Sequence, residues 1–283
     1  MSSSRFVQLT FLPAMAAIAG VGVWLSASKD GPEGLLLLLG ALAIAVSFAA
    51  ERAAPYRPEW NRSSGDRGRD IAHAVVNETL GFASLALLPL LDGRLTVVDA
   101  WPSSWPFALQ VLFAVLVADL GITVTHRISH RVGWLWRLHA VHHSVTRFYG
   151  FNGLLKHPLH QAVELAAGVT PLVLIGLPEN VAGALALCVV IQLLLQHSNV
   201  AYAVGPARRW LALNHAHRFH HVNSAGEGDV NFGLFTTIWD RWLLGTYRWE
   251  PHTTFSSEDL GVAGRADYPT RYLDQLREPF RSS

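Results

Sequence analysis

The sequence predicts an all-α membrane protein with about six transmembrane or re-entrant helices and a cytoplasmic cap of histidine-rich helices. Three observations lead to this fold class. The chain of 283 residues is 51% hydrophobic and only 15% charged, whereas a soluble domain carries about 25% charged residues. Its apolar residues gather in stretches that are long enough to cross a bilayer. Nine of its fourteen histidines fall in two short clusters, His126 to His143 and His215 to His221.

Six largely uncharged stretches are the expected membrane segments. They cover residues 7–26, 34–50, 71–91, 106–125, 159–177 and 181–197. The last two are either separate spans or the two arms of a re-entrant hairpin. The first stretch follows Arg5 and is longer than the apolar core of a secretory signal peptide. We therefore expect it to remain in the protein as a membrane anchor.

The positions of Lys and Arg predict the orientation in the membrane. If all six stretches span, 20 of the 22 basic residues lie on one side, and only Lys29 and Arg94 lie on the other. Because basic loops stay in the cytoplasm, both termini and both histidine clusters should be cytoplasmic in a multi-pass protein of the cell membrane. This topology explains the basic residues, so they give no indication of nucleic-acid binding. The single cysteine, Cys188, excludes an internal disulfide.

The chain divides into three regions by composition. Residues 1–100 hold the first membrane helices and a cytoplasmic loop rich in Arg, Pro, Ser and Gly. Residues 101–250 hold the histidine clusters and should form the catalytic region. Residues 251–283 form a polar cytoplasmic tail with one short helix near "TRYLDQLREPF".

The histidines recur at helical spacing. "HRISH" places His126 and His130 four residues apart, on one face of a helix. "HAVHH" and "HRFHH" each show an i, i+3, i+4 pattern. The first contains His139, His142 and His143, and the second contains His217, His220 and His221. Several imidazoles on one buried face would leave polar atoms unpaired, which is costly, and a metal ion removes that cost. Eight such nitrogens exceed the four ligands of an ordinary zinc site, so the pattern indicates two ions close together.

The spacing limits the choice of metal without settling it. "HRISH" lacks the general-base glutamate of the metalloprotease motif HExxH. No carboxylate lies between His126 and His143 or between His197 and His221. A neutral ligand set of this kind suits reduced iron that reacts with O2, while zinc stays an alternative because imidazole binds both metals.

These motifs resemble those of the fatty acid hydroxylase/sterol desaturase superfamily of membrane di-iron enzymes. The resemblance covers about residues 119–247, including "KHP", "QHSN" and "NFGLFTTIWDRWLLGTY". It implies two iron ions as cofactor, O2 as co-substrate, and hydroxylation or desaturation of a lipid C–H bond. The metal ligands that it implies are His126, His130, His139, His142, His143, His197, His217, His220 and His221. One departure is that Gln192 and Gln196 stand where some members have an additional pair of histidines.

Asp119 is the expected catalytic residue that does not bind metal. It lies seven residues before His126, on the same face of the predicted helix, and a carboxylate within a membrane span indicates function. We expect it to accept a ring N–H from a metal-binding histidine. His157 is expected to begin a helix, whereas His73, His160 and His215 are expected to be interfacial side chains. Glu78 and Glu164 either line the cavity or extend to the interface.

The expected partners are a lipid from the bilayer and an external electron donor. The chain lacks the GxGxxG and CxxCH motifs of nucleotide and haem domains, and one cysteine cannot hold an iron–sulfur cluster. A ferredoxin or a cytochrome b5-like carrier with its reductase should therefore dock near the cytoplasmic arginines. The alternative functions are a multi-histidine metal transporter and a zinc-dependent membrane hydrolase. A transporter should carry polar residues on both sides of the membrane midplane, and a hydrolase should carry a general base, neither of which the sequence shows.

Overall fold

The computed structural model describes residues 2–28, 33–91, 95–224 and 226–281. Within these ranges the regular elements are all helices, and extended pairing is limited to isolated bridges between single residues. This confirms the all-α fold class.

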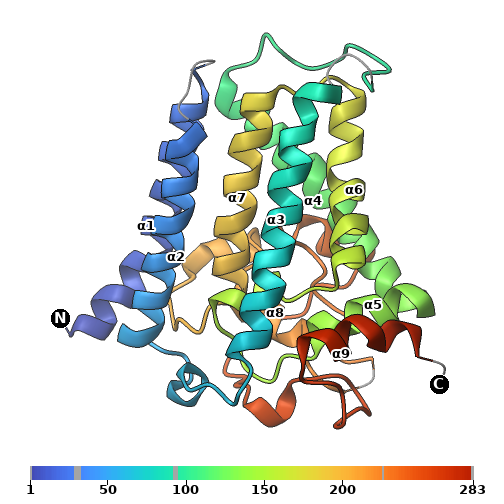
Figure 1. Ribbon diagram of the computed structural model, residues 1–283. Helices are drawn as coiled ribbons and strands as arrows, with labels where there is room; N and C mark the ends of the chain where they lie inside the picture. The colour runs from blue at the N-terminus through green and yellow to red at the C-terminus, as the bar shows by residue number, and fades with distance from the viewer. Residues whose placement is uncertain (1, 29–32, 92–94, 225, 282–283) are drawn as a thin grey trace.

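Six long helices lie side by side and make up the upper part of the molecule in Figure 1. They are α1 (Ser3–Ser26), α2 (Glu33–Ala53), α3 (Arg67–Leu91), α4 (Phe107–Arg131), α6 (Pro158–Leu174) and α7 (Glu179–His197). Each coincides with one of the six predicted stretches. Three shorter helices lie at the lower end: α5 (Gly133–His143), α8 (Asn214–His220) and α9 (Tyr272–Arg277). The short helix expected in the tail is thus present as α9.

Four of the long helices are long and apolar enough to cross a membrane. These are α1, α2 from Gly34 onward, α4 and α7. Of the other two, α6 has only 17 residues, and the described side chains of α3 include the polar sequence "RGRD" at its start. The protein is therefore a membrane protein, with four candidate spans among the residues that the structure describes, and the count of about six stays a prediction.

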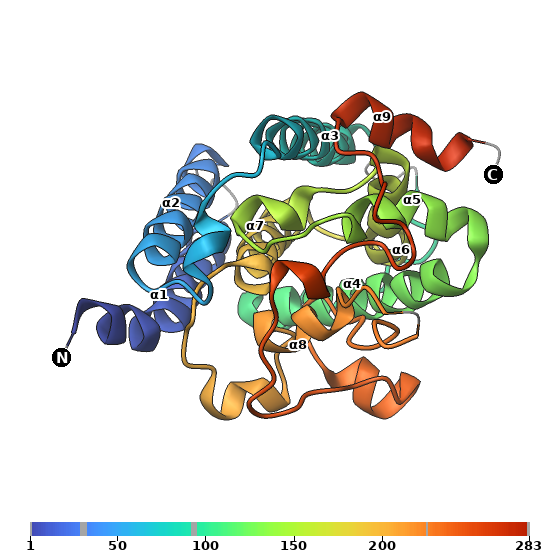
Figure 2. The same cartoon turned by 90° about the horizontal axis from the view of Figure 1, so that it is seen from below.

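The bundle is organised around α7, which packs against α1, α2 and α4 and lies inside the ring of helices in the view from below (Figure 2). On its far side, α4 packs closely against α6. A Cβ atom on Gly121 would lie 2.2 Å from the carbonyl oxygen of Ala167, and one on Gly168 would lie 3.0 Å from Ile122 Cγ1. Small residues at such a crossing let two backbones approach. This contact sets where the last turns of α4, with His126 and His130, stand relative to α6.

The C-terminal tail packs beneath the bundle. Gln275 of α9 is fully buried, lies 2.9 Å from His73 Nε2, and donates a hydrogen bond to Ser144 Oγ, just after α5. The expectation that His73 is interfacial is therefore wrong, because the tail covers it.

Candidate metal centre

Nine histidines converge at the lower end of the bundle, eight of them from four helices and His221 from the position directly after α8. They form two groups, and within each group one ring nitrogen from every histidine lies within 4.8 Å of the others. The first group, called here the five-histidine group, contains His126, His130, His139, His143 and His220. The second, the four-histidine group, contains His142, His197, His217 and His221. The structure thus brings together all nine histidines that the sequence predicts as ligands.

Two short helices contribute to both groups. On α5, His139 and His143 enter the five-histidine group, while His142 enters the other. On α8 the division is reversed, since His220 joins the five-histidine group and His217 joins His142. Residues at i and i+4 share a face of a helix, and the residue at i+3 lies beside them. The two HxxHH motifs therefore run across the pair of groups and place them next to each other.

Backbone carbonyls orient several of the rings. His126 Nδ1 lies 2.9 Å from the Phe232 carbonyl oxygen, and His220 Nδ1 lies 2.9 Å from that of Val230. His142 Nδ1 is held in the same way by Leu155, at 3.0 Å. A carbonyl oxygen only accepts hydrogen bonds, so each of these rings carries its proton on Nδ1 and presents a bare Nε2 to the group. This is the tautomer that a metal-binding histidine requires.

The Nε2 atoms approach one another without enough protons to pair them. His139 Nε2 lies 2.9 Å from that of His126 and 3.1 Å from that of His143. His217 Nε2 lies 3.1 Å from those of both His197 and His221. One N–H cannot donate to two nitrogens at once. Two imidazoles bound to one ion at about 2.1 Å and at right angles would have their nitrogens about 3 Å apart, so both groups fit a metal ion.

Other nitrogens in the centre are unpaired as well. Nε2 of His130 and of His220 is buried and has no hydrogen-bond partner among the described residues, and the same holds for Nδ1 of His221. Buried polar atoms are nearly always paired in folded proteins. Their number here is a second indication that the centre binds metal.

Burial keeps the rings neutral. It lowers the pKa of His139, His142 and His143 well below the usual value for imidazole, and nearby imidazoles lower it further. The histidines of α8 share this shift and its causes. A neutral ring has a free lone pair, so the centre is preset to coordinate a cation at neutral pH.

Asp119 does not meet a histidine, and the prediction that it accepts a ring N–H is wrong. Its carboxylate accepts the backbone N–H groups of Leu234, Phe235 and Thr236 at 2.7 to 3.1 Å, and the Thr236 hydroxyl at 2.7 Å. These bonds fix the segment that follows Phe232, whose carbonyl orients His126. Asp119 thus acts on the centre through the backbone.

Asp240 also fixes the segment around Phe232 by accepting backbone N–H groups. It accepts the N–H groups of Phe232 and Gly233, both at 2.8 Å, and the Thr246 hydroxyl at 2.7 Å. The sequence marks Asp240 only as part of the stretch "NFGLFTTIWDRWLLGTY" that carries the family resemblance. Two acidic residues that are 121 positions apart therefore hold one short segment beside the five-histidine group.

A buried polar chain adjoins the same group. His160 is fully buried with its ring 4.5 Å from that of His139, so the expectation that it is interfacial is wrong. Its Nε2 lies 2.9 Å from Ser129 Oγ. Glu164, one turn on, forms a salt bridge with Lys156 and faces His160 Nδ1 at 3.8 Å. Glu164 therefore lies inside the protein, next to the centre.

The remaining predicted residues lie outside both groups. His157 caps α6, as expected, by accepting the Leu159 N–H. His215 is half-buried near Trp249. Gln192 and Gln196 are buried and donate to backbone carbonyls of Ala212, Gly233 and Leu234. These glutamines support the segment below the centre and contribute no ligand.

Comparisons with known proteins find similar sequences. The family model for fatty acid hydroxylase matches residues 111–246. Over 248 residues the chain is 32% identical to ornithine lipid hydroxylase OlsE of Rhizobium tropici, an alignment that covers 84% of this chain and 73% of that protein. It is 31% identical over 150 residues to alkylglycerol monooxygenase of Danio rerio, which covers 52% of this chain but only 31% of the relative. The human alkylglycerol monooxygenase is 29% identical over 150 residues, 53% of this chain and 32% of the relative. No solved structure matches the chain.

Proposed function

This chain belongs to the fatty acid hydroxylase family, and on that premise we propose that it hydroxylates a C–H bond of a membrane lipid with two iron ions and O2. The observation that carries the proposal is the pair of adjacent, buried, all-imidazole groups at one end of a membrane helix bundle. The hydroxylase and monooxygenase relatives favour hydroxylation over desaturation.

We assign one iron ion to each histidine group. Iron held there would supply the reduction of O2 and the oxidation of an unactivated C–H bond. The chain's own part is to hold the nine rings, to orient them through carbonyls such as those of Phe232 and Leu155, and to keep bulk water away. Hydrolytic chemistry has less support, because the nearby carboxylates are occupied: Asp119 by backbone amides, Glu164 by Lys156, and Asp229 by His130.

The reaction needs an external electron donor. One C–H bond and one O2 give one alcohol and one water only if two electrons and two protons are added. We infer that a ferredoxin or cytochrome b5-like carrier docks on the cytoplasmic face near Arg131, Arg137 and the adjacent Arg208 and Arg209, because charge complementarity speeds such encounters. This assignment places the catalytic region, residues 101–250, at the cytoplasmic face of the cell membrane, with both termini on the same side.

Isotope labelling tests the proposal. Cells that make the wild-type chain or its His142→Ala variant are grown under 18O2, and their lipids are compared by mass spectrometry. We expect a lipid that gains one 18O atom with the wild type only. A product that has lost two hydrogens would instead show desaturation. Stoichiometric zinc in an active protein that takes up no O2 would overturn the oxygenase function itself.

A further inference from the structure

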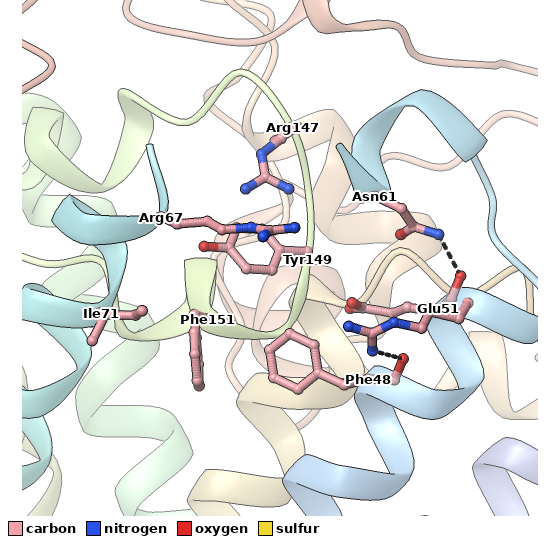
Figure 3. Close-up of a pocket in the computed structure, with 9 residues that line it drawn as sticks. Phe48, Glu51, Asn61, Arg67, Ile71, Arg147, Tyr149 and Phe151 are labelled. Carbon is pink, nitrogen blue, oxygen red and sulfur yellow. Dashed lines mark hydrogen bonds between the residues drawn. The ribbon is translucent and has the colours of Figure 1, made fainter. Parts of the chain in front are cut away.

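A cavity lined by both charged and apolar side chains lies outside the metal centre. It has a volume of about 130 Å³ and opens between the end of α2, the start of α3 and the loop that enters the 3-10 helix η2 (Gly150–Leu154) (Figure 3). No histidine lines it. The cavity is therefore separate from the two histidine groups, and its own lining must indicate what it could bind.

Positive charge exceeds negative charge in this cavity. Arg147 is neutralised by two hydrogen bonds to Asp66, at 2.6 and 2.9 Å. Arg52 and Arg67 also line the cavity and form no ion pair among the described residues. Arg52 donates only to the carbonyl of Phe48, at 2.9 Å, and both arginines are exposed. Two guanidinium groups are thus available to an anion.

The acid inside the cavity does not cancel this surplus. Glu51 is only 3% exposed. Its Oε1 accepts the backbone N–H groups of Gly150 at 2.8 Å and Asn199 at 3.1 Å. These bonds tie Glu51 to the loop. The three arginines outnumber the carboxylates of Glu51 and Asp66 together, so the cavity suits a ligand with net negative charge.

One wall of the cavity is apolar. The rings of Phe48 and Phe151 meet edge to face with centroids 4.9 Å apart, and Ile71 on α3 is 48% exposed beside them. Arg52 stands in the last turn of α2, a candidate membrane span. At that level a span leaves the hydrocarbon and meets lipid headgroups. A cationic rim above an apolar wall at this depth matches an amphiphile that is anionic at one end.

We propose that this cavity binds the anionic headgroup of a membrane lipid, with Arg52 and Arg67 contacting its phosphate or carboxylate. The site is distinct from the proposed hydroxylation site, and the side chain of Phe148 lies between the two. Arg147 and Tyr149 line the cavity, while Phe148 between them packs flat on His197 with centroids 5.5 Å apart. Successive side chains of extended backbone point to opposite sides, and Tyr149 is extended, with φ −163° and ψ 164°. A bound lipid therefore supports the loop that covers the four-histidine group.

Native mass spectrometry of the full chain in a neutral detergent tests this site. Phosphatidylglycerol and phosphatidylcholine with identical acyl chains are offered in equal amounts. We expect wild-type protein to retain phosphatidylglycerol in preference, and the double variant Arg52→Gln/Arg67→Gln to lose that preference by about tenfold or more, because each arginine near the headgroups contributes separately. Arg62→Gln is the matched control, since Arg62 is exposed on the segment that joins α2 to α3 and does not line the cavity.

A single variant controls for the case in which the double variant does not fold. Arg67→Gln removes no hydrogen bond among the described residues, so it should insert normally and still weaken the preference by about threefold to fivefold. An unchanged preference in both variants would overturn the proposal. Displacement of the lipid by inorganic phosphate at equal concentration would also overturn it, by showing that a free anion is the occupant. Because lipid retention is measured without turnover, these outcomes are independent of whether the chain proves to be a hydroxylase.

Discussion

The two histidine groups share α5 and α8, yet different parts of the chain orient them. In the five-histidine group, the segment 229–232 supplies three partners: a carboxylate oxygen of Asp229 lies 2.9 Å from His130 Nδ1, and the carbonyls of Val230 and Phe232 orient two other rings. In the four-histidine group, His142 relies on Leu155, and His197 has only a 3.3 Å contact with the carbonyl of Leu193.

Packing replaces hydrogen bonding in the four-histidine group. Phe148 is fully buried and lies parallel to His197, with an interplanar angle of 12°, and it meets His221 edge-on at 5.1 Å. A carboxylate partner raises the basicity of a ligating histidine, whereas an aromatic neighbour does not. We therefore expect the five-histidine group to hold its ion more tightly, and the four-histidine group to lose its ion first when a chelator is added.

The largest effect should come from removing the central ring of each group. His139 and His217 each approach two partner nitrogens, so His139→Ala and His217→Ala should each lose one of two ions and reduce hydroxylation by about 100-fold or more. Metal content per chain and labelled product measure both effects, with His215→Ala as the control. Loss of both ions from either variant would show that the groups do not bind metal independently.

A smaller effect, confined to one group, is expected from Asp229→Asn. The amide keeps the shape of the side chain but weakens its bond to His130, and outer partners of this kind contribute about 10- to 100-fold to metal affinity. A chelator titration should show the five-histidine ion released earlier while the other is unchanged. Glu227→Gln removes the same charge two residues away, from an exposed position, and should leave both ions in place. Equal weakening of both groups by Asp229→Asn would contradict the comparison.

Phe148→Leu should weaken the four-histidine group and leave the five-histidine group unchanged. Stacking between aromatic rings contributes about 0.5–1.5 kcal/mol, so the four-histidine ion should bind about two- to tenfold more weakly. The five-histidine ion should be unaffected. Phe255→Leu is a suitable control, because Phe255 is equally part of the buried cluster around Phe148 but packs on Phe219 instead of a ligand. If the four-histidine ion of Phe148→Leu is released at the same chelator concentration as in the wild type, packing does not hold this group.

Much of this comparison could be predicted from the sequence. Hydrophobic stretches locate the six long helices, and the i, i+3, i+4 spacing locates the ligand candidates, because both patterns are local. The division of neighbouring residues such as His142 and His143 between two groups could not be predicted, since it depends on how α5 and α8 face each other. The sequence also could not show which carbonyl orients which ring, because every residue has a backbone carbonyl.

The roles of buried polar residues were the least predictable. Asp119 has the spacing of a residue that faces His126, but its partners are backbone amides 115 to 117 positions away. His73 and His160 lie near predicted helix ends, which favours an interfacial position, whereas the tail covers His73 and the packing of α4 against α6 covers His160. Such contacts are set by tertiary packing, for which single-residue patterns carry no signal.

Gln275→Ala should have the smallest effect on the metals and serves as the test of what both groups share. The tail residue Gln275 touches neither group directly, but it joins His73 on α3 to Ser144, the residue after His143. Removing the amide leaves buried partners unpaired, which costs about 1–3 kcal/mol, so the melting temperature should fall in a thermal shift measurement. Gln8→Ala, on α1 and away from the tail, should change it much less. Because Gln275 supports the fold beneath both groups, the order in which a chelator removes the two ions should stay as in the wild type. A reversed order would show that the tail distinguishes between the groups, and that the contrast between carboxylate and aromatic support is not what sets their affinities.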